Sequence, residues 1–324
     1  MTYQSYSGII ILGKDVIPLA DKDTITKDYM QDKETFADAF NFFIYGGEQV
    51  IKPDQLRPLD TTSIALPYGD DDQPVPMQRY RDILKSVTAM EDDNAAYLLL
   101  GIENQSQIHY AMPVRNMLYD AIQYVTQVDD AARSHKMSDK MPETRAEFLS
   151  GFYKTDRLLP IITLTIYFGA DEWDAPRSLY DMFSVKDEKL MRFVSDYKLN
   201  LLAPAEIPDD EFSKFHTELN LALKYVKYSK NKNKLKEMIQ EDAAYKSVSR
   251  KTADMLNIVT SSGLHYKDRE ERVDMCEAIE GIKNDAVLDT LISLVKKGLL
   301  TLSQAAEEAN MSISEFESKT GLKA

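Results

Sequence analysis

The sequence predicts a mixed α/β fold followed by a helical C-terminal region. Two apolar stretches, "YLLLGIENQS" (97–106) and "LLPIITLTIYFG" (158–169), have the length and composition of buried strands, and the residues between them show helical periodicity. From about residue 206 onwards the pattern is helical and highly charged. The order helix, strand, strand, helix, strand is typical of an α/β core.

The first expected helix covers residues 24–45, where apolar side chains recur at helical intervals. Glycine and proline interrupt this pattern at 46–60, and "YGDDDQPVP" (68–76) reads as an acidic turn. A strand is expected at about Ile83 to Val87, and the turn "EDDN" (91–94) joins it to the strand at 97–106. We expect these two strands to be antiparallel neighbours.

The next expected helix covers residues 108–128 and has Pro113 near its first turn, where a missing N–H is tolerated. A polar, mobile-looking segment (129–150) separates this helix from the strand at 158–169. The predicted buried face of the helix consists of Val114, Leu118, Ile122 and Val125, with Met117, Ala121, Tyr124 and Val128 beside it.

Composition restricts the class of protein. The chain has 324 residues, 44% of them hydrophobic and 28% charged, which indicates a globular protein of about two domains. No apolar run reaches the roughly 18 residues that span a bilayer, and the N-terminus lacks the basic region of a secretory signal. A single cysteine, Cys276, excludes an intramolecular disulfide and a zinc-thiolate cluster. We therefore expect a cytoplasmic protein with no membrane partner.

One strand ends in polar residues that a core strand does not need. Glu103 and Gln105 close the stretch 97–106, and a strand's period of two places them on one face. If the preceding strand is antiparallel, Asp82 near its start can approach this end. Two carboxylates with a carboxamide form an oxygen-rich site suited to magnesium or manganese, which would compensate the charge of Glu103.

At these residues the chain resembles the PD-(D/E)XK nuclease superfamily. More closely, it resembles the branch of Rpn recombination-promoting nucleases, also described as PD-(D/E)XK transposases. The resemblance covers about residues 29–230, and its motifs occur in the family's order. The segments that carry it are "RDILK" (81–85), "GIENQS" (101–106), "MPVRNMLYDAIQY" (112–124), "LPIITLTIYFGADEWDAPRSLYDMF" (159–183) and the opening helix within 29–56.

The resemblance implies a restriction-endonuclease-like mixed sheet flanked by helices and a catalytic set of Asp82, Glu103 and Gln105. Asp82 and Glu103 would bind Mg²⁺ or Mn²⁺, and DNA would be the substrate. Gln105 stands where the superfamily's general pattern has lysine, so it can orient water by hydrogen bonding but supplies no charge. Arg115 is a better candidate for that charge than Lys85, which an offset of three places opposite Asp82.

Other residues carry weaker predictions. Asp38 could be an auxiliary acid on the first helix, and Arg115 and Tyr119, four apart, could stack on one helix. The plain alternative is that Asp82 and Glu103 form structural ion pairs with nearby arginines. Trp173 is expected to be a packing anchor. The four histidines share no metal-ligand spacing, so we expect none of them to be catalytic.

Two C-terminal features bear on partners. The segment "KYVKYSKNKNKLK" (224–236) is a candidate for contacting the DNA backbone, and a solvated helix face is an equal alternative. The pattern of the tail 300–322 is that of a helix–turn–helix, with Ser312 as the N-cap of the second helix. The acidic residues of this second helix would repel DNA phosphates, which favours a role in packing or protein contact. The lysines of the first feature are Lys224, Lys227, Lys230, Lys232, Lys234 and Lys236.

The sequence therefore predicts a metal-dependent DNA endonuclease, linked to recombination or mobile DNA, that could form a homo-oligomer. The alternative is a weakened or inactive nuclease fold that serves as a nucleic-acid-binding or protein-interaction module. Gln105, in place of the superfamily's lysine, is the residue that favours this alternative. The expected organisation is an N-terminal extension (1–28), a nuclease-like domain (29–205), a helical region (206–285) and a helix–turn–helix-like tail (286–324).

Overall fold

The computed structural model describes residues 19–58, 88–91, 96–138, 141–267 and 270–322. The chain divides into two compact units, with the boundary between Lys227 and Tyr228. The strands of the main sheet are β1 (Leu56–Pro58), β2 (Thr88–Glu91), β3 (Ala96–Gln105), β4 (Ile161–Tyr167) and β5 (Asn200–Leu202). The helices of the first unit are α1 (Leu19–Met30), α2 (Lys33–Tyr45), α3 (Met112–Met137), α4 (Arg145–Ser150), α5 (Glu188–Met191) and α6 (Leu219–Tyr228), the last of which reaches the unit boundary.

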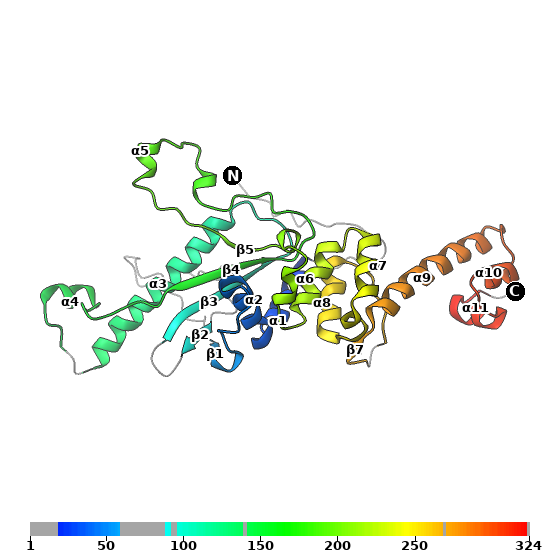
Figure 1. Ribbon diagram of the computed structural model, residues 1–324, viewed down its shortest axis with the longest axis horizontal. Coiled ribbons are helices and arrows are strands. Elements are labelled where there is room, and N and C mark those ends of the chain that lie inside the picture. The colour runs from blue at the N-terminus through cyan, green and yellow to red at the C-terminus, as the bar shows by residue number, and fades with distance from the viewer. Residues whose placement is uncertain (1–18, 59–87, 92–95, 139–140, 268–269, 323–324) are drawn as a thin grey trace, which may run out of the picture. The chain divides into compact units, whose positions relative to one another are not determined.

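The first unit is built on a five-stranded mixed sheet with strand order β1-β2-β3-β4-β5 (Figure 1). The β1–β2 and β2–β3 pairs are antiparallel, whereas the β3–β4 and β4–β5 pairs are parallel. Helix α3 lies along β4, and α1 contacts β3. The expected mixed α/β architecture with flanking helices is therefore confirmed.

The opening region forms two helices where the sequence pattern predicted one. Asp32 separates them, because its side chain accepts a hydrogen bond from Thr35 N (2.9 Å) and so caps the start of α2. At the other end, Gly46 adopts a left-handed conformation (φ 62°) that ends the helix. Asn41, fully buried on α2, donates to and accepts from the backbone of Ile51. The next loop is thereby fixed to this helix.

Helix α3 extends beyond its predicted end, and its buried face differs from the predicted one. It runs to Met137, and the segment 129–150 also contains α4. Val114, expected on the buried face, is 39% exposed, whereas the polar residues Asn116 and Asp120 are buried. The reason lies in the sheet, where β4 presents threonine side chains to α3 and so selects polar partners from it.

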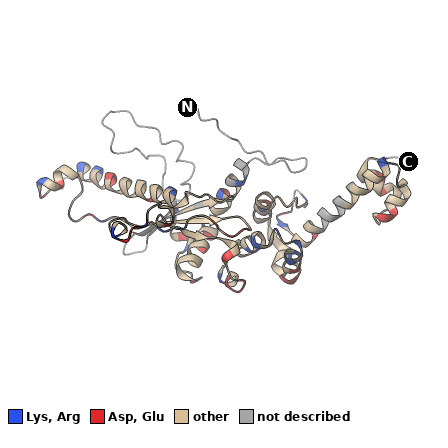
Figure 2. Cartoon of the chain, turned by 90° about the horizontal axis from the view of Figure 1, so that it is seen from above, with Lys and Arg blue, Asp and Glu red and all other residues tan. Residues whose placement is uncertain are grey.

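The second unit is helical. Its larger part contains α7 (Lys232–Glu241), α8 (Arg250–Thr260), α9 (Met275–Lys296) and a two-stranded sheet of β6 (Val248–Ser249) and β7 (Arg272–Val273). Positions of basic and acidic residues, coloured blue and red on the ribbon, are interspersed along its helices (Figure 2). The helical C-terminal region predicted from the sequence is confirmed.

The C-terminal tail forms two short helices, α10 (Leu302–Glu308) and α11 (Ile313–Thr320). Ser312 caps α11 as predicted: its hydroxyl accepts from the backbone N–H of Glu315, and the Glu315 carboxylate accepts from the backbone N–H of Ser312. Phe316 is fully buried against Leu291 of α9 and two alanines of α10. These contacts give the tail a small hydrophobic core with the second helix fixed by a capping box.

Candidate active site

The candidate site lies where two parallel strands end and the connecting helix begins. Strand β3, helix α3 and strand β4 form a βαβ unit, because β3 and β4 are parallel neighbours. Within it Glu103 is paired with Thr165, and Gln105 with Tyr167. In α/β sheets, ligands bind beyond the carboxyl ends of parallel strands, close to helix N-termini. The polar end of β3 therefore occupies the part of the fold where binding sites form.

The three predicted catalytic residues are not described in equal detail. Asp82 lies outside the described residues, and of Glu103 only the backbone is described. Gln105 is half-buried, and its amide donates to the carbonyl oxygen of Asn104 (3.0 Å). The strand predicted at 83–87 lies outside the described residues. The strand that follows it, β2, is antiparallel to β3 and pairs Thr88 with Leu100, in the middle of β3.

Arg115 and Tyr119 form the contact expected from their spacing. The guanidinium Nε of Arg115 donates to the Tyr119 hydroxyl (3.2 Å) in the first turns of α3. Tyr119 is almost fully buried, whereas Arg115 is partly accessible. Burial, together with the positive charge of Arg115, lowers the pKa of His109, which lies just before the helix. Tyr119 therefore holds the positively charged Arg115 side chain near the N-terminus of α3.

Asp38, predicted as an auxiliary acid, has an extensive structural role. It is 1% exposed on α2, and its carboxylate accepts hydrogen bonds from the backbone N–H groups of His216 and Thr217. The hydroxyl of Thr217 donates to the same carboxylate (2.7 Å). Both carboxylate oxygens are thus occupied in joining α2 to the loop before α6. These contacts account for a buried carboxylate without assigning it any chemistry.

A buried polar layer between α3 and β4 was not predicted from the sequence. Asn116 donates to the Thr165 hydroxyl (2.8 Å), and one turn later Asp120 accepts from the Thr163 hydroxyl (2.6 Å). The Tyr197 hydroxyl donates to the second oxygen of Asp120 (2.7 Å). The pattern that could have revealed this layer is a pair of polar residues four apart on the helix and a pair of threonines two apart on the strand. Each pair marks one face of its element.

Burial dominates the electrostatics of this layer. It raises the pKa of Asp120, although the hydrogen bonds from Thr163 and Tyr197 act in the opposite direction. The pKa of Tyr197 is strongly raised, first by burial and then by the neighbouring carboxylate of Asp120. The Oδ1 atom of Asn116 is buried and has no hydrogen-bond partner among the described residues. The helix–sheet contact next to the candidate site therefore contains costly polar groups.

Trp173 follows β4 and is a packing residue, as expected. It is 5% exposed, and its ring meets that of Tyr167 edge-on, with centroids 5.5 Å apart. Both belong to a cluster with Met112 at the start of α3. The aromatic pair thus holds the end of β4 against the N-terminus of α3.

The donor chemistry of the predicted set fits a hard divalent cation. Among the described residues no group of three or more His, Cys, Asp or Glu side chains could hold a metal ion. The ligands predicted from the sequence are Asp82 and Glu103, with Gln105 beside them, and Asp82 and the Glu103 side chain lie outside the part that the structure describes. Carboxylate and carboxamide oxygens are the donors that magnesium and manganese prefer. No histidine or cysteine enters this set, so its chemistry does not favour zinc.

The lysines of 224–236 differ in their surroundings. Lys227 is largely buried; its ammonium group donates to the carbonyl of Ile207 and pairs with Asp209 (2.6 Å). Lys234 lies over the ring of Tyr228, 4.3 Å from its centroid. The four lysines from Lys230 to Lys236 are exposed. Lys227 is therefore a structural residue, and the exposed lysines are the ones whose charge a ligand can reach.

Fold and site together define an α/β protein with a βαβ unit whose acidic strand end lies beside the N-terminus of a long helix. Comparison with known families gives the particular one. The chain belongs to the family described as "Putative transposase, YhgA-like", whose model matches residues 75–255. This confirms the resemblance to the Rpn branch. No curated protein and no solved structure matches the chain significantly.

No helix within the described part of the chain is long and apolar enough to cross a membrane.

Proposed function

We propose that the protein is a divalent-metal-dependent DNA endonuclease that hydrolyses phosphodiester bonds and acts in recombination or on mobile DNA. The proposal includes a PD-(D/E)XK type of sheet, with Asp82 and Glu103 as metal ligands, and a cytoplasmic location. The observation that carries it is the match of 75–255 to a transposase family, since that range contains Asp82, Glu103, Gln105 and all of α3. The mixed sheet and the polar end of β3 are consistent with it.

A divalent cation, when bound, would polarise the phosphoryl oxygen and lower the pKa of a coordinated water. The residues of the chain supply the remaining functions. The Gln105 amide has a donor and an acceptor with which to orient the attacking water. Arg115 supplies a positive charge for the phosphate, and its contact with Tyr119 limits the conformations of its side chain.

A second function follows from one specific observation. Gln105 lacks the charge of the lysine that is usual in the superfamily, and charge at that position stabilises the developing negative charge on phosphorus. A chain that binds DNA without cutting it would then act as a binding or interaction module on a nuclease fold. The two functions differ in a measurable result, because only a nuclease converts supercoiled DNA into open-circular or linear DNA.

Nicking of a supercoiled plasmid distinguishes the two. The purified full chain is incubated with the plasmid in Mg²⁺, in Mn²⁺ or in excess EDTA, and open-circular and linear products are quantified. We expect products with either cation and none in EDTA. Full activity in EDTA would exclude the metal-dependent mechanism. Binding of the plasmid without cleavage under all three conditions would support the binding module.

A further inference from the structure

The far end of α3 carries an apolar surface that the first unit leaves uncovered. The α4 arm, which we define as residues 130–138 and 141–160, contains the end of α3, helix α4 and the return to β4. On α4, Phe148 is 73% and Leu149 72% exposed. Met137 and Met141 nearby are 87% and 79% exposed. Large apolar side chains gathered at one place on a surface mark an interaction site.

The α4 arm is a built structure, because its backbone is held by specific contacts. The buried carboxylate of Glu147 accepts hydrogen bonds from three backbone N–H groups, and Thr144 completes a capping box at the start of α4. Gly151 lies so close to α3 that an added Cβ would come within 2.8 Å of the Ala132 Cβ. The three N–H groups that bind Glu147 are those of Glu143, Thr144 and Lys154.

A second acid of the arm is also used internally. Asp156 contacts Nε2 of His135 (2.8 Å) and accepts from the backbone N–H of Tyr153 (2.6 Å). The rings of His135 and Tyr153 are stacked, with centroids 3.6 Å apart. These contacts fasten the return segment to the end of α3. The carboxylates of Asp156 and Glu147 are therefore directed into the arm and not toward a partner.

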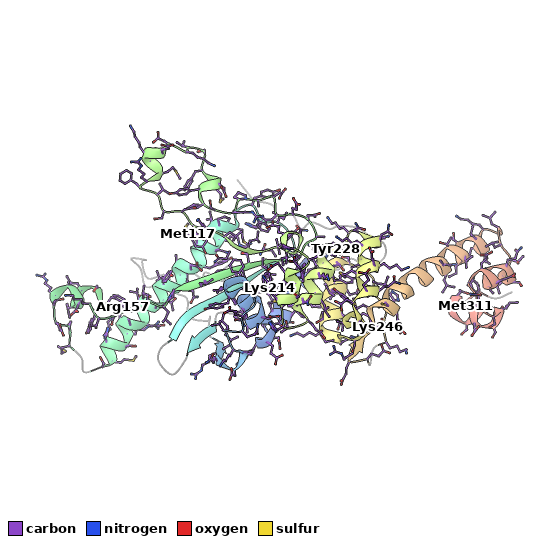
Figure 3. All side chains as sticks on the ribbon, in the orientation of Figure 1. Met117, Arg157, Lys214, Tyr228, Lys246 and Met311 are labelled. Carbon is purple, nitrogen blue, oxygen red and sulfur yellow. The ribbon has the colours of Figure 1, made fainter. Side chains whose placement is uncertain are left out.

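The cations of the arm are oriented differently. Lys136, Arg145, Lys154 and Arg157 are all exposed, and none forms an ion pair with a described residue. In Figure 2 the ribbon at the left-hand end carries several Lys and Arg positions, coloured blue, and Figure 3 labels Arg157 on the segment leading back to β4. Among the described acids of the arm, Glu143 and Asp130 are exposed, and Asp130 is paired with Arg133 (2.5 Å). In a chain of net charge −14, the arm thus presents apolar and cationic groups together.

We propose that the α4 arm is a DNA-docking element in which Phe148 and Leu149 wedge against the bases while the surrounding cations contact phosphates. Apolar wedges flanked by basic residues unstack and bend duplex DNA in this way. Charge favours DNA over a symmetric contact with a second copy of the chain, because a two-fold contact would bring the two sets of cations together. The inference rests on the proposed function for its ligand.

The length of α3 sets the distance between the candidate site and the arm. Its 26 residues span roughly 39 Å at about 1.5 Å per residue. The candidate site lies at the N-terminus of α3 and the arm at its C-terminus. At about 3.4 Å per base pair, the arm would reach a duplex that runs along α3 on the order of ten base pairs from the site of cleavage. A short duplex would therefore occupy the site without reaching the arm.

Binding to duplexes of two lengths tests this inference. The full chain in EDTA is titrated into labelled duplexes of about 8 and 30 base pairs, as wild type and as the double variant Phe148→Ser/Leu149→Ser; the shorter duplex, at roughly 27 Å, cannot span α3. We expect the double variant to weaken binding to the 30-base-pair duplex by about tenfold or more and to leave binding to the short duplex unchanged. Lys136→Gln/Lys154→Gln should show the same length dependence and lose effect as salt rises.

Phe193→Ser is the matched control, since Phe193 is 90% exposed near α5 and lies outside the arm. It should bind both duplexes like the wild type. Equal affinity of the wild type and the double variant for the long duplex would overturn the inference, and plasmid nicking by the wild type would show that the proposed function survives it. A monomer–dimer equilibrium changed by the double variant, with DNA binding intact, would also overturn it and assign the arm to a second copy. Absence of both DNA binding and nicking in the wild type would contradict the two proposals together.

Discussion

Asp120 shows how burial changes the protonation of a single residue. The residue is 9% exposed between α3 and β4, and burial raises the pKa of its carboxyl despite two hydroxyl donors. The folded protein therefore binds this proton more tightly than the unfolded chain. The free energy of unfolding that depends on this group is greatest at low pH and falls as pH rises from about 3.8 through the raised pKa.

Asp120→Asn should therefore change stability in a pH-dependent way. The amide cannot ionise, so the variant avoids the cost that the wild type meets at neutral pH. We expect its melting temperature relative to wild type to rise between pH 4 and pH 7, by roughly 2–4 °C for each 1 kcal/mol avoided. Thermal unfolding at several pH values measures this difference, and a difference independent of pH would show that Asp120 is not the titrating group.

Gln105 allows a test of how charge serves the proposed chemistry. Gln105→Lys introduces the superfamily's usual cation and should keep or raise the nicking rate, whereas Gln105→Leu removes both charge and hydrogen bonding. We expect the leucine variant to lose about 100-fold or more in rate, as when a stabilising donor is removed from an active site. Single-turnover nicking with the two variants side by side measures the effect. Equal rates for both would mean that position 105 takes no part in the reaction.

At the scale of elements, the sequence predicted the existence of strands and helices better than their faces. The apolar stretch 97–106 and Pro113 predicted β3 and the start of α3. Hydrophobic periodicity predicted the wrong buried face of α3, because it takes only apolar residues into account. The face that is buried includes the polar residues Asn116 and Asp120, which form hydrogen bonds with threonines of β4. The same periodicity predicted one helix where the structure has α1 and α2, because the hydrogen bond by which Asp32 caps α2 sets the boundary between them. The family resemblance predicted Asp82 and Glu103 as the site, and that assignment stays a prediction.

Asp38 joins two elements that are far apart in the sequence, so its removal should destabilise the fold. Asp38→Ala would leave the N–H groups of His216 and Thr217 without their acceptor. We expect a loss of about 3 kcal/mol or more in the free energy of unfolding, measured by chemical denaturation. Glu34→Ala, an exposed change on the same helix, should cost less than about 0.5 kcal/mol. Unchanged stability of Asp38→Ala together with a loss of nicking would instead support the auxiliary-acid role.

At the scale of the whole molecule, a DNA ligand must overcome a net charge of −14. Such a chain repels phosphate on average, so DNA can approach only where cations gather locally. The exposed lysines of 230–236 and the α4 arm are two such places. Lys227 is not a third, because its ammonium group is paired with Asp209.

The exposed lysines give a prediction about salt. Replacing Lys230, Lys232, Lys234 and Lys236 with glutamine should weaken DNA binding more at low salt than at high salt. For every lysine that neutralises a phosphate, its replacement should reduce the slope of log affinity against log salt by about 0.9. Lys224 and Lys227 are left intact, because the latter is part of the fold. Binding that is the same at every salt concentration would assign the segment to a solvated helix face.

The most direct test of the metal site compares nicking and stability in Glu103→Gln and Asp82→Asn. If the two carboxylates hold a cation, they repel each other in its absence, and each near-isosteric change removes that repulsion. The account predicts that both variants lose Mg²⁺-dependent nicking while the metal-free melting temperature stays equal to that of the wild type or rises slightly. Structural ion pairs would behave differently, because an arginine would be left unpaired. A lowered melting temperature with undiminished nicking would contradict the assignment of Asp82 and Glu103 to the active site.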